Sequence, residues 1–197
     1  ATVASDGSET KLMVGSFETE NKIQIHIKPQ ISTEAFVVAL AKLQGEAPIL
    51  PGQASLFRDG SYIGQTALPL LRPGEEHDLF FGVDDQMSVK RHVVKDQKDE
   101  AGIVARSNAL ERHFVTELQN LHSQPVEIVV RETIPVPRND KIEVQILKEV
   151  TTPDYTSDVD NIKGLLGWTF TLPAKEEREL GLGWRVSWPK DQNLSGL

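Results

Sequence analysis

Residues 167–172 read GWTFTL and residues 180–189 read LGLGWRVSWP, and these two stretches decide the fold. In both of them, large apolar residues occupy every second position, with small or polar residues between them. A period of two is typical of a β-strand that buries one face. Pro173 and the charged residues up to Glu177 separate the two stretches, which predicts a turn and hence a hairpin.

The same alternation recurs upstream. It predicts strands at residues 22–28, 87–94, 126–132 and 142–147, which lie between turn-forming segments. Residues 34–43 form a longer apolar stretch, and the adjacent β-branched pair Val37 and Val38 favours a strand over a helix there. Asp59-Gly60 lies between residues 53–58 and 61–68, which is a strong signal for a tight hairpin.

Two segments are harder to interpret. Residues 108–122 combine a capping-box pattern, Asn108 with Glu111, with apolar residues near helical spacing, so a helix and a strand both fit. We favour the strand, because residues 124–125 lead directly into the next strand. Residues 95–102 read KDQKDEAG, which predicts a solvated loop.

The number and spacing of these short strands predict an all-β fold, an antiparallel β-sandwich that is immunoglobulin-like in general architecture. Residues 134–137 read IPVP, and proline cannot donate to a β-ladder, so this segment belongs at an edge or a crossover. We predict a single domain over residues 1–197, with residues 1–20 as a flexible segment or an edge strand. The chain begins without a signal sequence and is expected to be a C-terminal fragment of a longer protein.

The composition excludes several classes of function. The formal net charge is −8, from 21 Lys and Arg against 29 Asp and Glu, which argues against nucleic acid as a partner. The chain has no Cys, which excludes disulfides and thiolate chemistry. No apolar run approaches the roughly 18 residues that a membrane span needs. A periplasmic or extracellular location and a cytoplasmic one both stay open.

The histidines do not form a metal-binding pattern. His26, His77, His92, His113 and His122 lack the H-x-H, H-x-x-x-H and H-E-x-x-H spacings. We therefore interpret them as solvated or hydrogen-bonded side chains. No catalytic, cofactor-binding or metal-binding residue is assigned, and no cofactor is expected.

Acidic residues offer weaker alternatives. Asp154, Asp158 and Asp160 with Asn161 lie in a polar stretch, but the fifth position counted from Asp158 is not an oxygen ligand, so the EF-hand pattern fails. A looser calcium site stays open there and at residues 84–85. Two carboxylates that catalyse glycoside hydrolysis also stay open as an alternative. The distance between the two carboxyl groups decides this, and a sequence does not give that distance.

Glycines and tryptophans are interpreted as structural. Gly52, Gly60, Gly64 and Gly82 match no phosphate-binding motif, and we expect them where positive φ or a close backbone approach is needed. The alternation predicts that Trp168, Trp184 and Trp188 belong to the core rather than to a sugar-stacking platform. Trp188, beside Pro189 at the strand end, is the one expected to reach the surface.

The order of these elements resembles the C-terminal part of the mucoidy inhibitor A family, in its domain of unknown function. The resemblance covers residues 28–192. It is carried by residues 49–64 (ILPGQASLFRDGSYIG), 79–84 (LFFGVD), 125–136 and the closing hairpin. Family members carry an N-terminal domain and a coiled coil upstream, which the resemblance implies for the parent of this chain. The family's biochemical activity is not established, so no catalytic residue is carried over.

These observations favour a non-enzymatic β-sandwich that acts as an interaction or scaffold module of a larger protein. The expected partner is another protein or a second copy, through an apolar patch that upstream segments would otherwise cover. The alternative is a carbohydrate-binding or carbohydrate-active domain linked to exopolysaccharide, with a glycan as its ligand.

Overall fold

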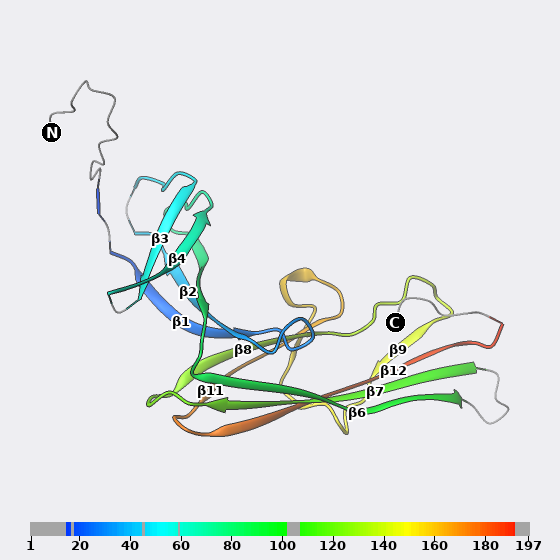
Figure 1. The fold of residues 1–197 in the computed structure, drawn as a ribbon. Coiled ribbons are helices and arrows are strands. Elements are labelled where there is room, and N and C mark those ends of the chain that lie inside the picture. The colour runs from blue at the N-terminus through cyan, green and yellow to red at the C-terminus, as the bar shows by residue number, and fades with distance from the viewer. Residues whose placement is uncertain (1–14, 17, 45, 59, 102–106, 192–197) are drawn as a thin grey trace. The chain divides into compact units, whose positions relative to one another are not determined.

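The computed structural model describes residues 15–16, 18–44, 46–58, 60–101 and 107–191. Within them the chain is almost entirely β-structure, with a single 3₁₀ turn, η1 (Val159–Asn161), and no α-helix (Figure 1). Contacts between Cα atoms divide the chain into two compact units. Unit 1 holds residues 1–22 and 39–79, and unit 2 holds residues 23–38 and 80–197.

A six-stranded sheet contains strands from both ends of the chain. Its order is β10 (Thr156–Ser157), β11 (Leu165–Leu172), β8 (Val126–Thr133), β1 (Glu20–Ile27), β2 (Ala35–Lys42) and β5 (Glu76–Val83). The neighbours β8 and β11 are antiparallel and pair Trp168 with Val130. In contrast, β1 and β8 run parallel, with Ile25 opposite Ile128, so this sheet is mixed.

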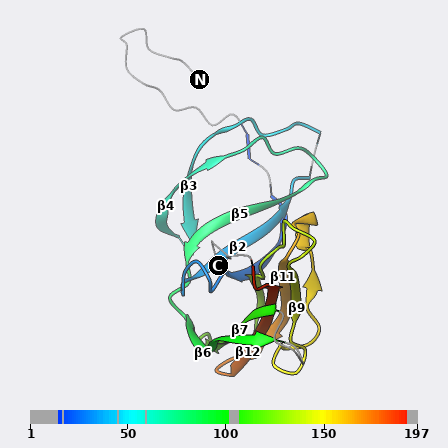
Figure 2. The same cartoon turned by 90° about the vertical axis from the view of Figure 1, so that its right-hand side faces the viewer.

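The second sheet of unit 2 has four strands. Its order is β6 (Met87–Ala101), β7 (Ser107–Asn120), β12 (Glu177–Pro189) and β9 (Glu143–Ile146). Every pairing in this sheet is antiparallel. Figures 1 and 2 show β6, β7 and β12 side by side as one layer, with β8 and β11 in the facing layer.

The core of unit 2 lies between these two sheets, which confirms the predicted all-β sandwich. Ile27, Ile128 and Val130 contribute from one sheet, and Leu118 and Val186 from the other, all with at most 1% of their surface exposed. In β11 and β12 large buried side chains alternate with glycine or polar residues, as the sequence predicts. A sandwich is the arrangement that buries one face of both sheets at once.

The three tryptophans belong to this core. Trp168 and Trp184 are each 3% exposed and Trp188 is 8% exposed, so the core assignment is confirmed. The expectation that Trp188 reaches the surface is wrong, because its side chain follows the inward parity of β12. A sugar-stacking platform built from these three rings is therefore not formed.

Residues 108–122 form a strand for most of their length, since β7 runs from Ser107 to Asn120. In contrast, the prediction of a solvated loop from residue 95 is wrong, because β6 continues as a strand to Ala101. Cross-strand ion pairs replace apolar contacts there: Lys95 meets Glu111 at 2.7 Å and Arg112 meets Asp96 at 3.1 Å. Charged pairs of this kind stabilise antiparallel ladders.

Two glycines in β12 allow a loop to lie against the sheet. A Cβ on Gly181 would stand 2.3 Å from the carbonyl oxygen of Val150, and one on Gly183 would stand 2.2 Å from Cγ2 of the same residue. Thr151 and Thr152 then hydrogen-bond to the backbone of these glycines. The pair of glycines in LGLG therefore serves a close backbone approach.

Unit 1 is built around a hairpin. β3 (Gly52–Arg58) and β4 (Ser61–Leu68) form a separate two-stranded antiparallel sheet, as Asp59-Gly60 predicts. Gly60 has φ of 78°, the left-handed conformation that this turn needs. A backbone bridge between Ile49 and Leu71 closes the loop that carries the hairpin.

Candidate interaction surface

The histidines that the sequence singles out lie in separate hydrogen-bonded settings. Nε2 of His26 lies 3.0 Å from Oε1 of Gln24, and Nε2 of His77 accepts from the backbone N–H of Arg72 at 3.1 Å. His92 lies 3.2 Å from Glu117, and its side chain is about half exposed. Within the part of the chain that the structure describes, no three side chains of His, Asp or Glu come together to hold a metal ion.

His113 and Glu111 share the outer face of β7. The imidazole Nε2 lies 2.9 Å from a Glu111 carboxylate oxygen, and the same oxygen accepts a hydrogen bond from Lys95. The hydrogen bond and positive charge of Lys95 hold the pKa of Glu111 below its usual range. This cluster therefore stabilises the long β6–β7 hairpin, and nothing in its geometry brings a third ligand or a nucleophile to it.

The acidic loop before β11 keeps its carboxylates apart. Asp154, Asp158 and Asp160 have positive φ, as does Asn161. The carboxylate of Asp158 accepts a hydrogen bond from the backbone N–H of Gly164 at 2.7 Å, which closes the loop on itself. These acids shape a tight turn rather than one set of ligands.

Asp84 is part of a network that ties three turns together. The carboxylate is buried, accepts from the backbone N–H of Gln86 at 3.0 Å, and lies 2.8 Å from Nε2 of His122. Beside it, Asn120 is completely buried and donates to the carbonyl oxygens of Gln124, Leu172 and Pro173.

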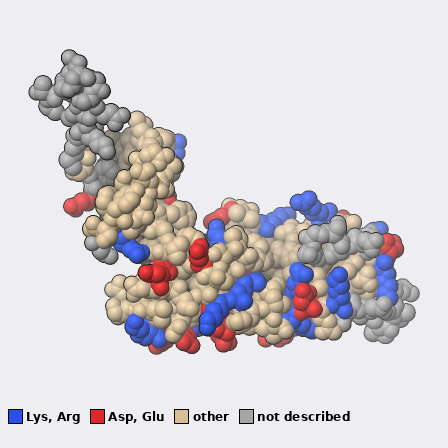
Figure 3. All heavy atoms as spheres, in the orientation of Figure 1, with Lys and Arg blue, Asp and Glu red and all other residues tan. Residues whose placement is uncertain are grey.

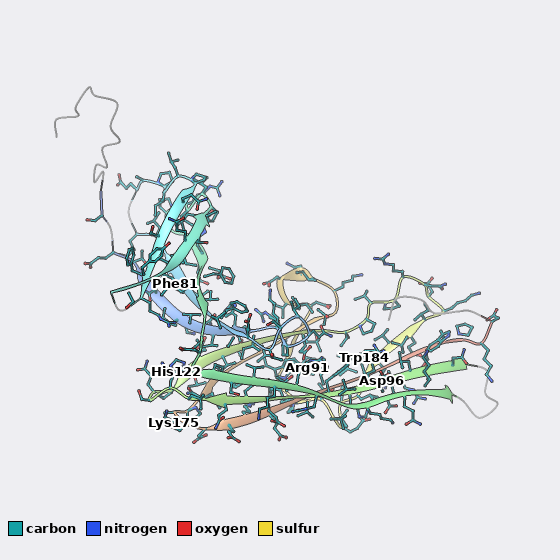
Figure 4. The ribbon with its side chains drawn as sticks, viewed as in Figure 1. Phe81, Arg91, Asp96, His122, Lys175 and Trp184 are labelled. Carbon is teal, nitrogen blue, oxygen red and sulfur yellow. The ribbon has the colours of Figure 1, made fainter. Side chains whose placement is uncertain are left out.

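A lysine closes the same end of the sandwich. Lys175, in the β11–β12 turn, donates to the carbonyl oxygen of Leu121. Figure 4 shows His122 and Lys175 at the end of unit 2 where these turns lie. Because the polar atoms of this network are engaged with turns of the chain, its role is to hold the end of the sandwich together.

A buried ion pair joins the two sheets of the sandwich. Arg91 in β6 donates two hydrogen bonds, each 3.2 Å long, to the two carboxylate oxygens of Glu132 in β8. Their side chains are only 13% and 4% exposed. The guanidinium also lies 3.9 Å from the ring centroid of Phe114. Burial raises the pKa of Glu132, and Arg91 opposes this rise.

This ion pair could have been found in the sequence from strand parity alone. Arg91 follows the inward positions of Met87 and Val89, and Glu132 follows those of Ile128 and Val130. Opposite charges at inward positions of two strands predict a pair across the core.

A shallow polar hollow lies on the outer face of the four-stranded sheet. Its volume is about 250 Å³, and its lining combines Lys90 and Arg178 with Glu117, Glu177 and Glu179. Such a surface of mixed charge is ordinary for a solvated sheet face.

The outer face of the β3–β4 hairpin carries an exposed pair of aromatic side chains. Phe57 and Tyr62 are opposite each other across the strands and are 59% and 57% exposed. Their rings meet edge to face, with centroids 5.6 Å apart and an interplanar angle of 63°. Exposed aromatic side chains are enriched in protein interfaces, because they offer large apolar area with few rotatable bonds.

The neighbours of this aromatic pair are uncharged. Gln53 is opposite Ala67, and Ser55 is opposite Gln65, all four being exposed. We call the outer face of the hairpin, formed by Gln53, Ser55, Phe57, Tyr62, Gln65 and Ala67, the neutral face. Figure 3 shows mainly uncharged atoms over the hairpin in this view, with a blue group at its edge, whereas the sandwich carries both blue and red atoms.

Isolated two-stranded hairpins are marginal in water, and a sheet gains stability from a third strand or from a packed face. The interior of unit 1 supplies only part of this, since Leu43 and Leu71 are buried but most of β3 and β4 is exposed. The neutral face is therefore a candidate interaction surface. Sequence reasoning missed it, because Phe57 and Tyr62 look like ordinary strand residues until their exposure is known.

Comparison with known proteins identifies a family for this chain but assigns no activity to it. The chain is similar to Protein F37C4.5 of Caenorhabditis elegans, with 25% identity over 146 residues, which is 74% of this chain. It spans only about a quarter, 26%, of the length of that relative. No helix among the described residues is long and apolar enough to cross a bilayer. Residues 1–190 match the family described as a domain of unknown function, DUF4139, and the chain therefore belongs to that family.

Proposed function

We propose that this chain is a non-enzymatic β-sandwich interaction or scaffold module of a larger protein, and that it binds protein through the neutral face of the β3–β4 hairpin. The observation that carries the proposal is the exposed pair Phe57 and Tyr62 on an uncharged sheet face. Contiguous exposed apolar surface on a soluble domain marks an interaction site. The small share of the C. elegans relative that the chain spans supports a role as one piece of a longer chain.

The resemblance to the mucoidy inhibitor A family belongs to this proposal. It is supported by the motif in residues 49–64, whose second half forms the tip of the hairpin. Under this assignment the module would serve a protein that affects exopolysaccharide production. We also propose that residues 1–197 act together as one domain.

The test is made in the full-length protein in its own cells. Replacing Phe57 and Tyr62 by serine removes the aromatic surface, and both positions are exposed, so the fold is expected to persist. Replacing Val93 and Val94 by serine is the matched control, since these residues are 60% and 63% exposed on another strand. We expect the native complex to become smaller only with the first variant. An unchanged complex with the F57S/Y62S variant would contradict the proposal.

A carbohydrate-binding role is the second candidate, and one observation favours it. Phe57 and Tyr62 are flanked by Gln53, Ser55 and Gln65, whose neutral side chains can donate and accept hydrogen bonds as sugar hydroxyls require. The buried tryptophans do not support this role. Binding on a glycan array that disappears in the F57S/Y62S variant would favour it over protein binding.

A further inference from the structure

We infer that the free edge of β3 pairs with β3 of a second copy of this chain, so that two hairpins form one four-stranded sheet. This inference goes beyond the proposed function, because the second copy pairs with the edge of β3 and leaves the neutral face of both copies open to the proposed protein partner. In the described residues, β3 and β4 pair only with each other. The edge of β3 therefore presents backbone N–H and C=O groups that an added strand can satisfy.

Both edges of the four-stranded sheet have features that oppose such pairing. β6, at one edge of the four-stranded sheet, carries Lys90, Lys95 and Lys98 and has a register shift between Val93 and Lys95. Lysines and bulges on an edge strand oppose the addition of another strand. At the opposite edge of that sheet, β9 is only four residues long.

β3 has neither the lysines nor the irregularity of β6. It reads GQASLFR, so Arg58 at its end is its only charged residue. The register shift of the hairpin inserts its extra residue, Ile63, in β4, which leaves β3 regular from Gly52 to Leu56. Of the two hairpin edges, β3 is therefore the one suited to pairing.

A second copy fits this edge because the strand is complementary to itself. Antiparallel pairing about Ser55 places Gln53 opposite Phe57 and Ala54 opposite Leu56 of the other copy. The two Arg58 residues then lie about 20 Å apart, at opposite ends of the pair, so no like charges meet. Two-fold pairing of identical surfaces is also the commonest way in which a protein forms a dimer.

Pairing would also stabilise the two-stranded hairpin of unit 1. Each copy would contribute two strands, and the resulting sheet would reach the size at which a β-structure is stable in water. Phe57 and Tyr62 of both copies would lie on the same face, which doubles the aromatic surface that the proposed function uses.

The test uses purified protein and takes advantage of the absence of Cys from the sequence. Ser55→Cys places one thiol at the two-fold axis, where two opposite residues lie about 4.5–5.5 Å apart and can form a disulfide. Gln65→Cys is the matched control, because Gln65 is opposite Ser55 on the same face but belongs to β4. We expect a covalent dimer under mild oxidation from the first variant, and much slower formation from the second.

Charge variants at the same position test the pairing without a covalent bond. In sedimentation velocity over a concentration series, Ser55→Lys is expected to raise the dimer dissociation constant about tenfold or more, because two lysines meet at the axis. Gln65→Lys should leave the dissociation constant nearly unchanged. Mixing the Ser55→Lys and Ser55→Glu proteins should restore the dimer as a heterodimer.

Equal cross-linking of the two Cys variants, or a dimer that Ser55→Lys does not weaken, would overturn the inference. So would a chain that stays monomeric at every concentration. If these results coincide with loss of the cellular complex in the F57S/Y62S variant, the proposed function stands and only the pairing of β3 with a second copy is wrong.

Discussion

Replacing Arg91 by methionine would leave the Glu132 carboxylate buried without its partner. In the native protein this carboxylate receives two hydrogen bonds from Arg91, and it is 4% exposed. Methionine keeps most of the length and apolar volume of the arginine stem, so packing against Phe114 is largely retained. The substitution therefore tests the charge of residue 91 rather than its volume.

The expected loss in the free energy of unfolding is about 3–5 kcal/mol at neutral pH, which is the usual cost of removing one partner from a buried ion pair. Loss of the cation–π contact with Phe114 accounts for about 1 kcal/mol of this. Arg178→Met is the matched control, because Arg178 also lies 3.9 Å from an aromatic centroid, that of Phe170, but is exposed.

The loss should depend on pH in a definite direction. Burial raises the pKa of Glu132 in the folded state, so the folded protein binds its proton more tightly than the unfolded chain does. Stability from such a group is fully present below the unfolded pKa of about 4.3, and is lost as the pH rises through the folded pKa. Without Arg91 the folded pKa rises further, so the deficit of the variant should shrink as the pH falls from 7 toward 4.

Urea denaturation at a series of pH values measures this deficit directly. Replacing Glu132 by leucine in the Arg91→Met background removes the stranded carboxylate and should recover at least half of the loss. A loss below about 1 kcal/mol, or a deficit that is the same at pH 4 and pH 7, would refute the reasoning.

Three further substitutions test other parts of the sandwich. Asn120→Ala should cost about 1–3 kcal/mol of unfolding free energy in urea titrations, because three carbonyl oxygens lose their buried donor. Gly183→Ala should lower the melting temperature and cost about 1–3 kcal/mol, since the new Cβ overlaps Val150, and Val150→Ala in the same chain should relieve part of the loss. Glu111→Gln should destabilise the protein near neutral pH and much less below about pH 4. The pKa of Glu111 is lowered by Lys95, so its stabilisation is present above the unfolded pKa and is lost on acidification through the folded pKa.

The strands that bury one face could be predicted from the sequence. In β11 and β12 the inward positions around Trp168 and Trp184 are apolar. This alternation predicts both the strands and the residues that they bury. The strand interpretation of residues 108–122 is also confirmed by β7, although it rests on the strand that follows residues 124–125 and not on alternation, and although Asn108 and Glu111 resemble a helix start. Tertiary pairing along both sides of β7 decides this, since it lies between β6 and β12.

The extension of β6 could not be predicted in the same way. Residues 95–101 lack apolar alternation because this part of the hairpin is held by ion pairs such as Lys95 with Glu111. Each pair joins residues 16 positions apart, so no local window contains its reason. A charged stretch is therefore predicted to be a loop, unless the strand that pairs with it and carries the opposite charges is already known.

The exposure of the neutral face could not be predicted from the sequence either. Exposure depends on what packs against a strand, and in this hairpin apolar residues fall on both faces, at Leu56-Phe57 and at Tyr62-Ile63. Phe57 and Tyr62 are therefore indistinguishable from core residues until the hairpin is seen to form a sheet of its own. The signal that the sequence does contain is the scarcity of charge in both strands, where Arg58 at the end of β3 is the single charged residue.

The contrast between β6 and β3 connects stability with function. The charges of β6 form cross-strand pairs that hold the extended hairpin, and the same lysines would repel a strand added at its edge. β3, in which Arg58 is the single charged residue, has neither the cross-strand ion pairs nor the edge lysines of β6, so contacts added at its edge would stabilise its hairpin further. Amide hydrogen exchange should accordingly be fast in β3 when the protein is dilute and should slow as its concentration rises, while exchange in β7 stays unchanged. Protection of β3 that is independent of concentration would mean that the hairpin is stable by itself, and the physical reason for pairing would be lost.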